Sequence, residues 1–413
     1  MFDTAVIFLV LTALMAYVNI RFIKLPTTIG VMAIAMGLSL VLFGLNHFGV
    51  SDLLKYEVSL LESVDFSTVL MQGMLSLLLF AGALHVDLSQ LKTLRWQIGA
   101  LAVVGTLVST VIVGYAVWLI LPWAGLEIPL IYCLLFGALI SPTDPIAVMG
   151  IVKQAGAPKQ MELMIAGESL FNDGVGVVVF TLLLIAAASG QTPDAAHAGL
   201  LVAEEVGGGI LFGLLLGFIT YHMLKSIDSY QEEVLITLAA VLGGYALALH
   251  LHFSGPLAMV VAGLIVGNHG RERAMSQTTR KYVDMFWDLI DAILNAVLFV
   301  LIGLEIVVID YAAGLAAPIA LVIVITLLAR LIAVGAPVAL LNRYFRLPEG
   351  SWKVLTWGGL RGGISVALAL SIPAGPERDI VLALTYAVVV CSIFGQGLSV
   401  GAVVRRAVGS RAG

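Results

Sequence analysis

A series of apolar windows, each close to the length that crosses a bilayer, constrains this chain most. A transmembrane helix needs about 20 consecutive apolar residues, and thirteen such windows follow one another. They span residues 4–20, 26–44, 66–85, 97–121, 128–151, 160–189, 199–224, 234–251, 255–269, 284–308, 314–341, 351–373 and 379–404. Hydrophobic residues make up 60% of the 413 residues and charged residues only 11%, whereas soluble domains carry about 25% charged residues. The sequence therefore predicts an all-α, multi-pass membrane protein.

The sequence pattern excludes two other classes of protein, a membrane β-barrel and a nucleic-acid-binding protein. A membrane barrel would show alternating segments of about ten residues, and continuous apolar runs such as 175–188 contradict that pattern. The chain has no basic tract interleaved with aromatic residues, so it does not have the pattern of a nucleic-acid-binding protein.

The lysines and arginines alternate with the windows. Sixteen of the 21 fall in the loops after odd-numbered windows or in the C-terminal tail, and Lys353 lies just beyond one of these loops. Only Lys55 and Arg378 follow even-numbered windows. Positive residues favour the cytoplasmic side of a membrane. We therefore expect an N-terminus outside and a C-terminus in the cytoplasm, in the inner membrane of a cell.

A weak internal repeat divides the chain. The segment that begins at Pro26 resembles the one that begins at Pro256, and two windows are interrupted, at Ser141–Pro145 and at Trp357–Gly363. One odd window, the seventh, separates six windows from six, so the second unit enters the membrane with opposite polarity. Interrupted helices in an inverted repeat are typical of the midplane site of a secondary transporter.

Three acids and two arginines inside the windows stand out, because a carboxylate at a helix centre costs about 2.5–3.5 kcal/mol. Asp144 stands between two prolines, where a broken helix can present the Thr143 carbonyl and the Asp144 carboxylate as oxygen ligands. The alternative is a simple kink capped by the aspartate.

Glu168, Ser169, Asn172 and Asp173 form one stripe of a helix, because they are spaced i, i+1, i+4 and i+5. Carboxylate, hydroxyl and amide oxygens suit hard cations such as sodium. A polar seam between helices is the alternative.

Arg330 and Arg361 stay charged when buried and need counter-ions. Glu168 is the expected partner of Arg330. Arg361, in the interrupted twelfth window, is a second candidate partner, or else it has a structural role.

The remaining acids are less informative. Asp284, Asp288 and Asp291 are spaced i, i+4 and i+7, and they line either a cytoplasmic funnel or a solvated helix end. We expect Glu305 to reach the membrane interface. The acids of the second loop are expected to be solvated, and these are Asp52, Glu57, Glu62 and Asp65.

Three motifs together carry a resemblance to a known family. Ser-Pro-Thr-Asp-Pro at 141, Gly-Glu-Ser-Leu-Phe-Asn-Asp-Gly at 167 and Gly-Gly-Leu-Arg-Gly-Gly at 358 resemble the monovalent cation/proton antiporter-1 family. That family includes prokaryotic NhaP-type sodium/proton antiporters and the animal sodium/proton exchangers. The resemblance covers nearly the whole transmembrane chain.

The resemblance implies a homodimer in which a six-helix core carries the ion by an elevator-like movement against a scaffold. The scaffold would comprise residues 1–85 and 232–308, the core residues 97–190 and 314–405, and residues 199–224 would link them. It also implies the site residues. The cation would bind the Thr143 carbonyl, Asp144, Ser169 and Asp173, with Glu168 as a further candidate ligand. Asn172 would orient Asp173, and Arg330 would pair with Glu168.

The expected cargo is sodium or lithium against a proton, with no bound cofactor. Similar proteins that move two protons per sodium carry two aspartates where this chain has Asn172-Asp173, and a lysine where Arg330 stands. Asn172 does not titrate and arginine does not deprotonate, so the sequence predicts electroneutral one-for-one exchange. A potassium/proton antiporter and a cation channel are the alternatives, although no filter-like loop is present. An intramembrane aspartyl protease is disfavoured, because Asp173 lies in Asn-Asp-Gly.

Overall fold

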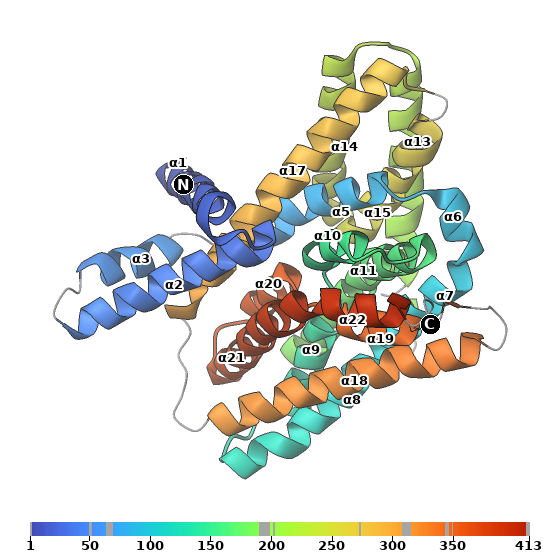
Figure 1. The fold of residues 1–413 in the computed structure, drawn as a ribbon. Helices are drawn as coiled ribbons and strands as arrows, with labels where there is room; N and C mark the ends of the chain where they lie inside the picture. The colour runs from blue at the N-terminus through green and yellow to red at the C-terminus, as the bar shows by residue number, and fades with distance from the viewer. Residues whose placement is uncertain are drawn as a thin grey trace.

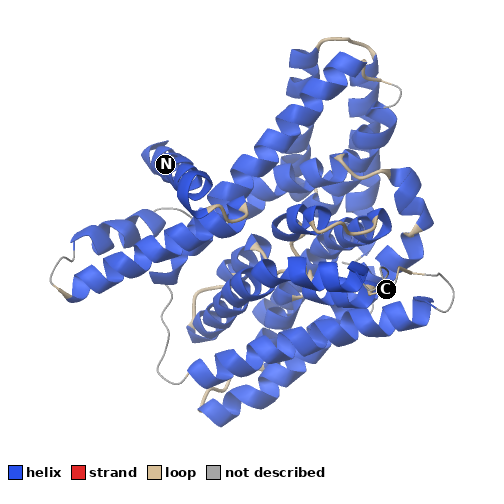
Figure 2. Ribbon diagram, viewed as in Figure 1, coloured by secondary structure: helices blue, strands red, loops and turns tan. Residues whose placement is uncertain are grey.

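The computed structural model describes residues 2–48, 52–62, 69–189, 199–200, 203–271, 274–307, 315–342, 347–348 and 350–409. Figure 2 shows helices and connecting loops, and no strand occurs within these ranges. In this part of the chain, nine helices are long and apolar enough to cross a membrane, and three shorter apolar helices accompany them. The prediction of an all-α membrane fold is confirmed.

Every predicted window that these ranges cover is occupied by a helix or by a broken pair of helices. The principal elements are α1 (Phe2–Val18), α2 (Thr27–His47), α5 (Leu75–Leu84), α8 (Thr106–Ile120), α9 (Leu130–Ile140), α10 (Ile146–Gln154), α11 (Lys159–Ser189), α13 (Gly208–Lys225), α14 (Tyr230–His250), α15 (Gly255–Ile265), α17 (Gln277–Leu304), α18 (Ala316–Asn342), α19 (Ser351–Trp357), α20 (Gly363–Ser371), α21 (Pro376–Cys391) and α22 (Leu398–Gly409). The short helices α3 (Asp52–Glu62) and α6 (Leu88–Thr93) belong to no candidate span, whereas α7 (Arg95–Gly99) begins the continuous helical segment Arg95–Ala124 that contains α8.

The helices pack mainly in two groups (Figure 1). In one group, α17 packs along α2 and against α5 and α14, while α15 packs on α5 and α13. In the other, α8 lies along α9 and α18, and α11, α20 and α21 pack against α9. Figure 1 shows α8 and α18 side by side, with α17 running diagonally from α14 to α2.

Two spans are interrupted where the sequence predicts a break. Between α9 and α10, residues 141–145 leave the helix, because Pro142 and Pro145 lack the N–H that a helical turn needs. Between α19 and α20, residues 358–362 are non-helical and include three glycines. The two breaks meet inside the second group of helices and define the site described below.

Glu305, directly after α17, is 7% exposed. For Glu57, the expectation of a solvated second loop is wrong. The second loop forms the helix α3, and its Glu57 is 8% exposed and accepts a hydrogen bond from Ser39. Helix α3 packs onto α2, and this contact buries Glu57. Asp65 lies outside the described residues.

Candidate ion-binding site

The two interrupted helices are hydrogen-bonded to each other where they cross. The main-chain N–H of Asp144 donates to the carbonyl of Leu360 at 2.8 Å. The Arg361 guanidinium donates to the carbonyls of Ser141 at 2.5 Å and Pro142 at 2.8 Å. These carbonyls are among those that lose their helical partners at the break, so an arginine satisfies them.

A glycine allows the crossing to be this close. A Cβ at Gly362 would overlap the side chain of Asp144. Any larger residue at this position would push the Asp144 carboxylate away from the crossing. The break between α19 and α20 therefore determines where Asp144 lies, although the two positions are 218 residues apart.

Helix α11 presents its polar stripe to the first break. Ser169 donates through its hydroxyl to the Thr143 carbonyl. Asn172 donates to the Thr143 hydroxyl at 2.9 Å and accepts from the Thr143 N–H at 3.3 Å. Asn172 therefore holds the non-helical segment between α9 and α10 in place. The hydrogen bonds of the Asn172 side chain go to Thr143 and not to Asp173.

Asp173 differs from its neighbours on the stripe. It is 7% exposed, and its carboxylate makes no hydrogen bond or ion pair with any residue that the structure describes. A buried carboxylate without a partner is costly, because desolvation penalises the charge. This residue therefore needs a cation or a proton to neutralise it.

Glu168 is compensated by a different group. Arg330, from the middle of α18, donates from Nη1 to one carboxylate oxygen and from Nη2 to the other at 2.9 Å. Nη2 also donates to the Leu355 carbonyl at 2.9 Å. Glu168 is 2% exposed and Arg330 6%. Of the two candidate partners for Glu168, the structure places Arg330 in contact with it, whereas Arg361 bonds to carbonyls.

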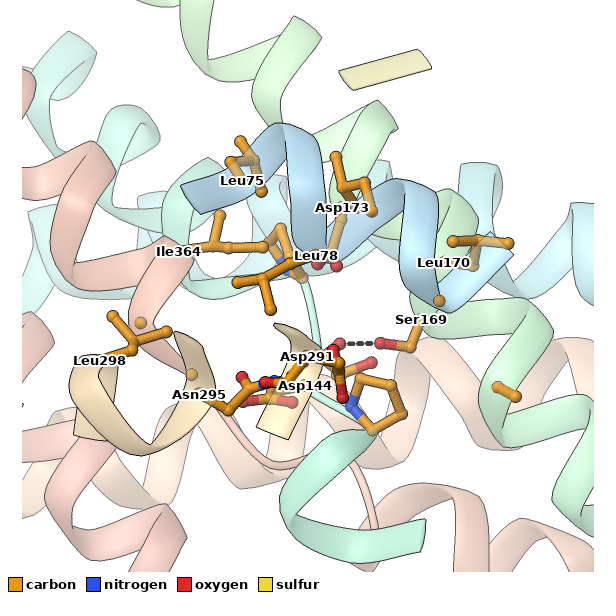
Figure 3. A pocket seen from close by; sticks show the side chains of 18 of the residues that line it. Leu75, Leu78, Asp144, Ser169, Leu170, Asp173, Asp291, Asn295, Leu298 and Ile364 are labelled. Carbon is orange, nitrogen blue, oxygen red and sulfur yellow. Dashed lines mark hydrogen bonds between the residues drawn. The ribbon is translucent and has the colours of Figure 1, made fainter. Parts of the chain in front are cut away.

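A cavity of about 330 Å³ opens beside the crossing (Figure 3). Its described lining contains no lysine, arginine or histidine. Leucines of α5 cover one side of it. The polar residues that line it are Thr143, Asp144, Ser169, Asp173, Asp291, Asn295 and Ser365. An acidic, largely apolar-walled cavity of this kind favours a small cation over an anion.

The structure thus brings Thr143, Asp144, Ser169 and Asp173 to one cavity, while Glu168, Arg330 and Arg361 lie behind it as a charge-compensating layer. Asn295 was not singled out from the sequence, and Asp291 was left between two interpretations. Their spacing of four on α17 is the signal that could have joined them.

The donor set suits a monovalent hard cation. It combines a main-chain carbonyl, hydroxyls and two carboxylates, which are oxygen ligands. Within the described ranges, no three histidine, cysteine, aspartate or glutamate side chains are grouped closely enough to hold a metal ion together.

Two interrupted helices that cross beside an acidic cavity are the arrangement typical of secondary transporters. A family model described as "sodium/hydrogen exchanger, transmembrane" matches residues 9–406. The chain belongs to this family, which is a family of transporters.

Relatives and a solved structure agree with this assignment. The chain is 52% identical over 411 residues to the sodium/proton antiporter NhaP of Pseudomonas aeruginosa, covering 98% of this chain and 97% of that one. It is 34% identical over 395 residues to the sodium/proton antiporter NhaH of Halobacillus dabanensis, covering 92% and 96%. The fold matches the sodium/proton antiporter MjNhaP1 from Methanocaldococcus jannaschii at pH 8, with a TM-score of 0.77, 20% identity and coverage of 98% and 97%.

Proposed function

We propose that this protein is a sodium/proton antiporter that exchanges one sodium ion, or one lithium ion, for one proton. The observation that carries the proposal is the buried carboxylate of Asp173, which has no hydrogen-bond or ion-pair partner among the described residues and lines the same cavity as Asp144. Both relatives named above are called sodium/proton antiporters, and this supports the choice of ions.

Charge counting supports the stoichiometry. The core site holds three acids, Asp144, Glu168 and Asp173, and two arginines, Arg330 and Arg361. When all five are ionised, the net charge is one negative. One sodium ion or one proton brings it to zero, whereas the empty site keeps an uncompensated charge in a low-dielectric interior. The core is therefore suited to move across the membrane when its site holds a sodium ion or a proton. It is not suited to do so when the site is empty.

Competition follows from the same geometry. Sodium and the proton use the same carboxylate oxygens, so binding of one excludes the other. Asn172 holds the Thr143 segment in place and contributes no proton. The Thr143 carbonyl and the Ser169 hydroxyl complete the cation ligands.

The remaining parts of the proposal concern the assembly. We place the protein in the inner membrane, with the N-terminus outside and the C-terminus cytoplasmic, on the distribution of its lysines and arginines. The division of the helices into two packing groups supports a core that moves against a scaffold, and the scaffold group would make a homodimer.

Ion flux in proteoliposomes tests the function. The purified protein is reconstituted with a pH-sensitive dye and an imposed pH gradient, and sodium, lithium and potassium are added in turn. Sodium and lithium should dissipate the gradient with saturating kinetics. A response to potassium alone would replace the proposal with potassium/proton antiport, and single-channel currents would replace it with a channel.

A further inference from the structure

Helix α17 carries a polar stripe that leads to the cavity. Asp284, Asp288, Asp291 and Asn295 share one face of the helix at spacings of four, three and four. The Asp284 side chain is 26% exposed and that of Asp288 67%, and from Asp288 the exposure decreases through the half-buried Asp291 to Asn295 at 2%. The stripe therefore joins solvent to the interior.

The first two acids of the stripe contact side chains of neighbouring segments. Asp284 accepts a hydrogen bond from Arg271 Nε at 2.9 Å. Asp288 lies 3.2 Å from Nε2 of His85. These contacts tie α17 to its neighbours on the solvent side of the cavity.

Asp291 makes no contact with a lysine, arginine or histidine side chain among the described residues. Within them, its carboxylate accepts one hydrogen bond, from Asn295 Nδ2 at 3.1 Å. Asn295 also donates to the Asp291 carbonyl at 2.8 Å, so the two side chains hold each other in place. Both line the cavity that contains Asp144 and Asp173 (Figure 3).

The groups that face Asp291 across the cavity are themselves acidic. Asp144 comes from the α9–α10 break and Asp173 from α11. Helix α5 contributes leucines and Gly82, the segment after it contributes Val86, and the α20 side contributes glycines, Ile364 and Ser365. Since Asp173 is buried and has no partner among the described residues, the cavity is built to receive a cation, and Asp291 adds a third negative charge to it.

We propose that Asp291 is a positioning residue that draws the transported cation into the cavity and passes it to Asp144 and Asp173. This rests on the proposed function. Asp291 belongs to the helix group of α2, α5 and α14, and it does not join Asp144 and Asp173 in one coordination shell. Asp291 therefore acts on the cation by its charge. It remains with the scaffold helices when the core carries the bound cation.

A charge that acts through space has a distinct signature. A neighbouring negative charge favours a bound proton as much as a bound sodium ion, because both carry one positive charge. Removing it should raise the Michaelis constant for sodium at alkaline pH, where protons do not compete. At acid pH, the weaker binding of sodium is offset by the weaker binding of the competing proton, so the Michaelis constant for sodium changes little.

The test measures the Michaelis constant for sodium across a pH series in proteoliposomes. Wild type is compared with Asp291→Asn, Asp291→Glu and Asp291→Ser, and with Asp288→Asn as a matched control one turn away. Asp291→Asn should raise the constant roughly tenfold at alkaline pH, the effect of one charge at about 10 Å and an effective dielectric constant of about 20. The difference should vanish at acid pH, Asp291→Glu should restore most of the affinity, and Asp288→Asn should resemble wild type.

Two results would overturn the inference. One is an unchanged constant in both Asp291→Asn and Asp291→Ser at alkaline pH. The other is an increase by the same factor at every pH, which would indicate a structural defect instead of a lost charge. If Asp291→Asn is poorly folded, Asp291→Ser provides the same comparison. Failure of wild type itself to exchange sodium for protons would instead overturn the proposed function.

Discussion

The guanidinium of Arg361 donates to the carbonyl of Pro142 at 2.8 Å, across 219 positions of sequence. This contact and the hydrogen bond from Asp144 N–H to the Leu360 carbonyl join the two interrupted helices directly. Separating the two breaks would expose these polar groups without partners. Access to the site must therefore change around the crossing, while the crossing stays intact.

Neutralising Asp173 should abolish exchange without weakening the fold. Asp173→Asn removes a buried charge that has no partner among the described residues, so its melting temperature in detergent should equal or exceed that of wild type. Exchange should fall to the background of protein-free liposomes, and Asp144→Asn should do the same. The surface variant Asp288→Asn serves as the active control. Wild-type rates in Asp173→Asn would remove this residue from the transport site.

The pair of Glu168 and Arg330 should behave as a unit. Arg330→Ala alone leaves Glu168 buried and uncompensated, which typically costs about 3–5 kcal/mol. The double variant Glu168→Ala/Arg330→Ala removes both charges and should be less destabilised than Arg330→Ala alone. Thermal unfolding of both single variants and the double variant measures the coupling. Losses that simply add would show that Glu168 has a different partner, with Arg361 the first to examine.

Transport should be insensitive to membrane voltage and should weaken in acid. One cation replaces one proton at a site whose other charges are fixed, so no net charge moves. The apparent Michaelis constant for sodium should rise as pH falls, approaching roughly tenfold per pH unit once the site is mostly protonated. The maximal rate should change less. Potassium gradients with valinomycin set the voltage, and a strong response of the rate would show unequal exchange and a second proton carrier.

Glu57, which lies outside the transport site, should make the stability of the folded protein depend on pH. Burial in the contact of α3 with α2 raises the pKa of its carboxyl, against the lowering effect of the Ser39 hydroxyl. The folded protein therefore holds a proton more tightly than the unfolded chain, and stability is lost as pH rises from the ordinary pKa through the raised one. Glu57→Gln keeps an oxygen acceptor for Ser39 and removes the charge. Its melting temperature should match wild type in acid and exceed it at neutral pH, and an advantage that does not change with pH would contradict this explanation.

The membrane segments and the two breaks were predictable, because each depends on local sequence. Apolar windows give the spans, and the prolines around Asp144 and the glycines around Arg361 give the interruptions. The one arginine in the long apolar run of the eleventh window also indicated a buried acidic partner.

Contacts between distant segments were harder to predict. The helical stripe placed Asn172 beside Asp173, but periodicity does not tell which neighbouring segment an amide will bond, and the structure gives it Thr143. The burial of Glu57 depends on the packing of the short helix α3 onto α2. This helix lies between two apolar windows, so the window pattern does not predict it. The pairing of His85 with Asp288 joins two segments 203 positions apart, and neither segment has a motif that identifies the other.

The distance in sequence between Glu168 and Arg330 has a consequence for biosynthesis. The two residues are 162 positions apart, and translation at about 5–20 residues per second separates their appearance by roughly 10–30 seconds. During that interval, Glu168 enters the membrane before its arginine exists. The nascent chain must keep this acid protonated or sheltered by the insertion machinery. A chain released before residue 330 would leave an unpaired acid inside the bilayer, and cellular quality control could recognise the truncated product by that defect.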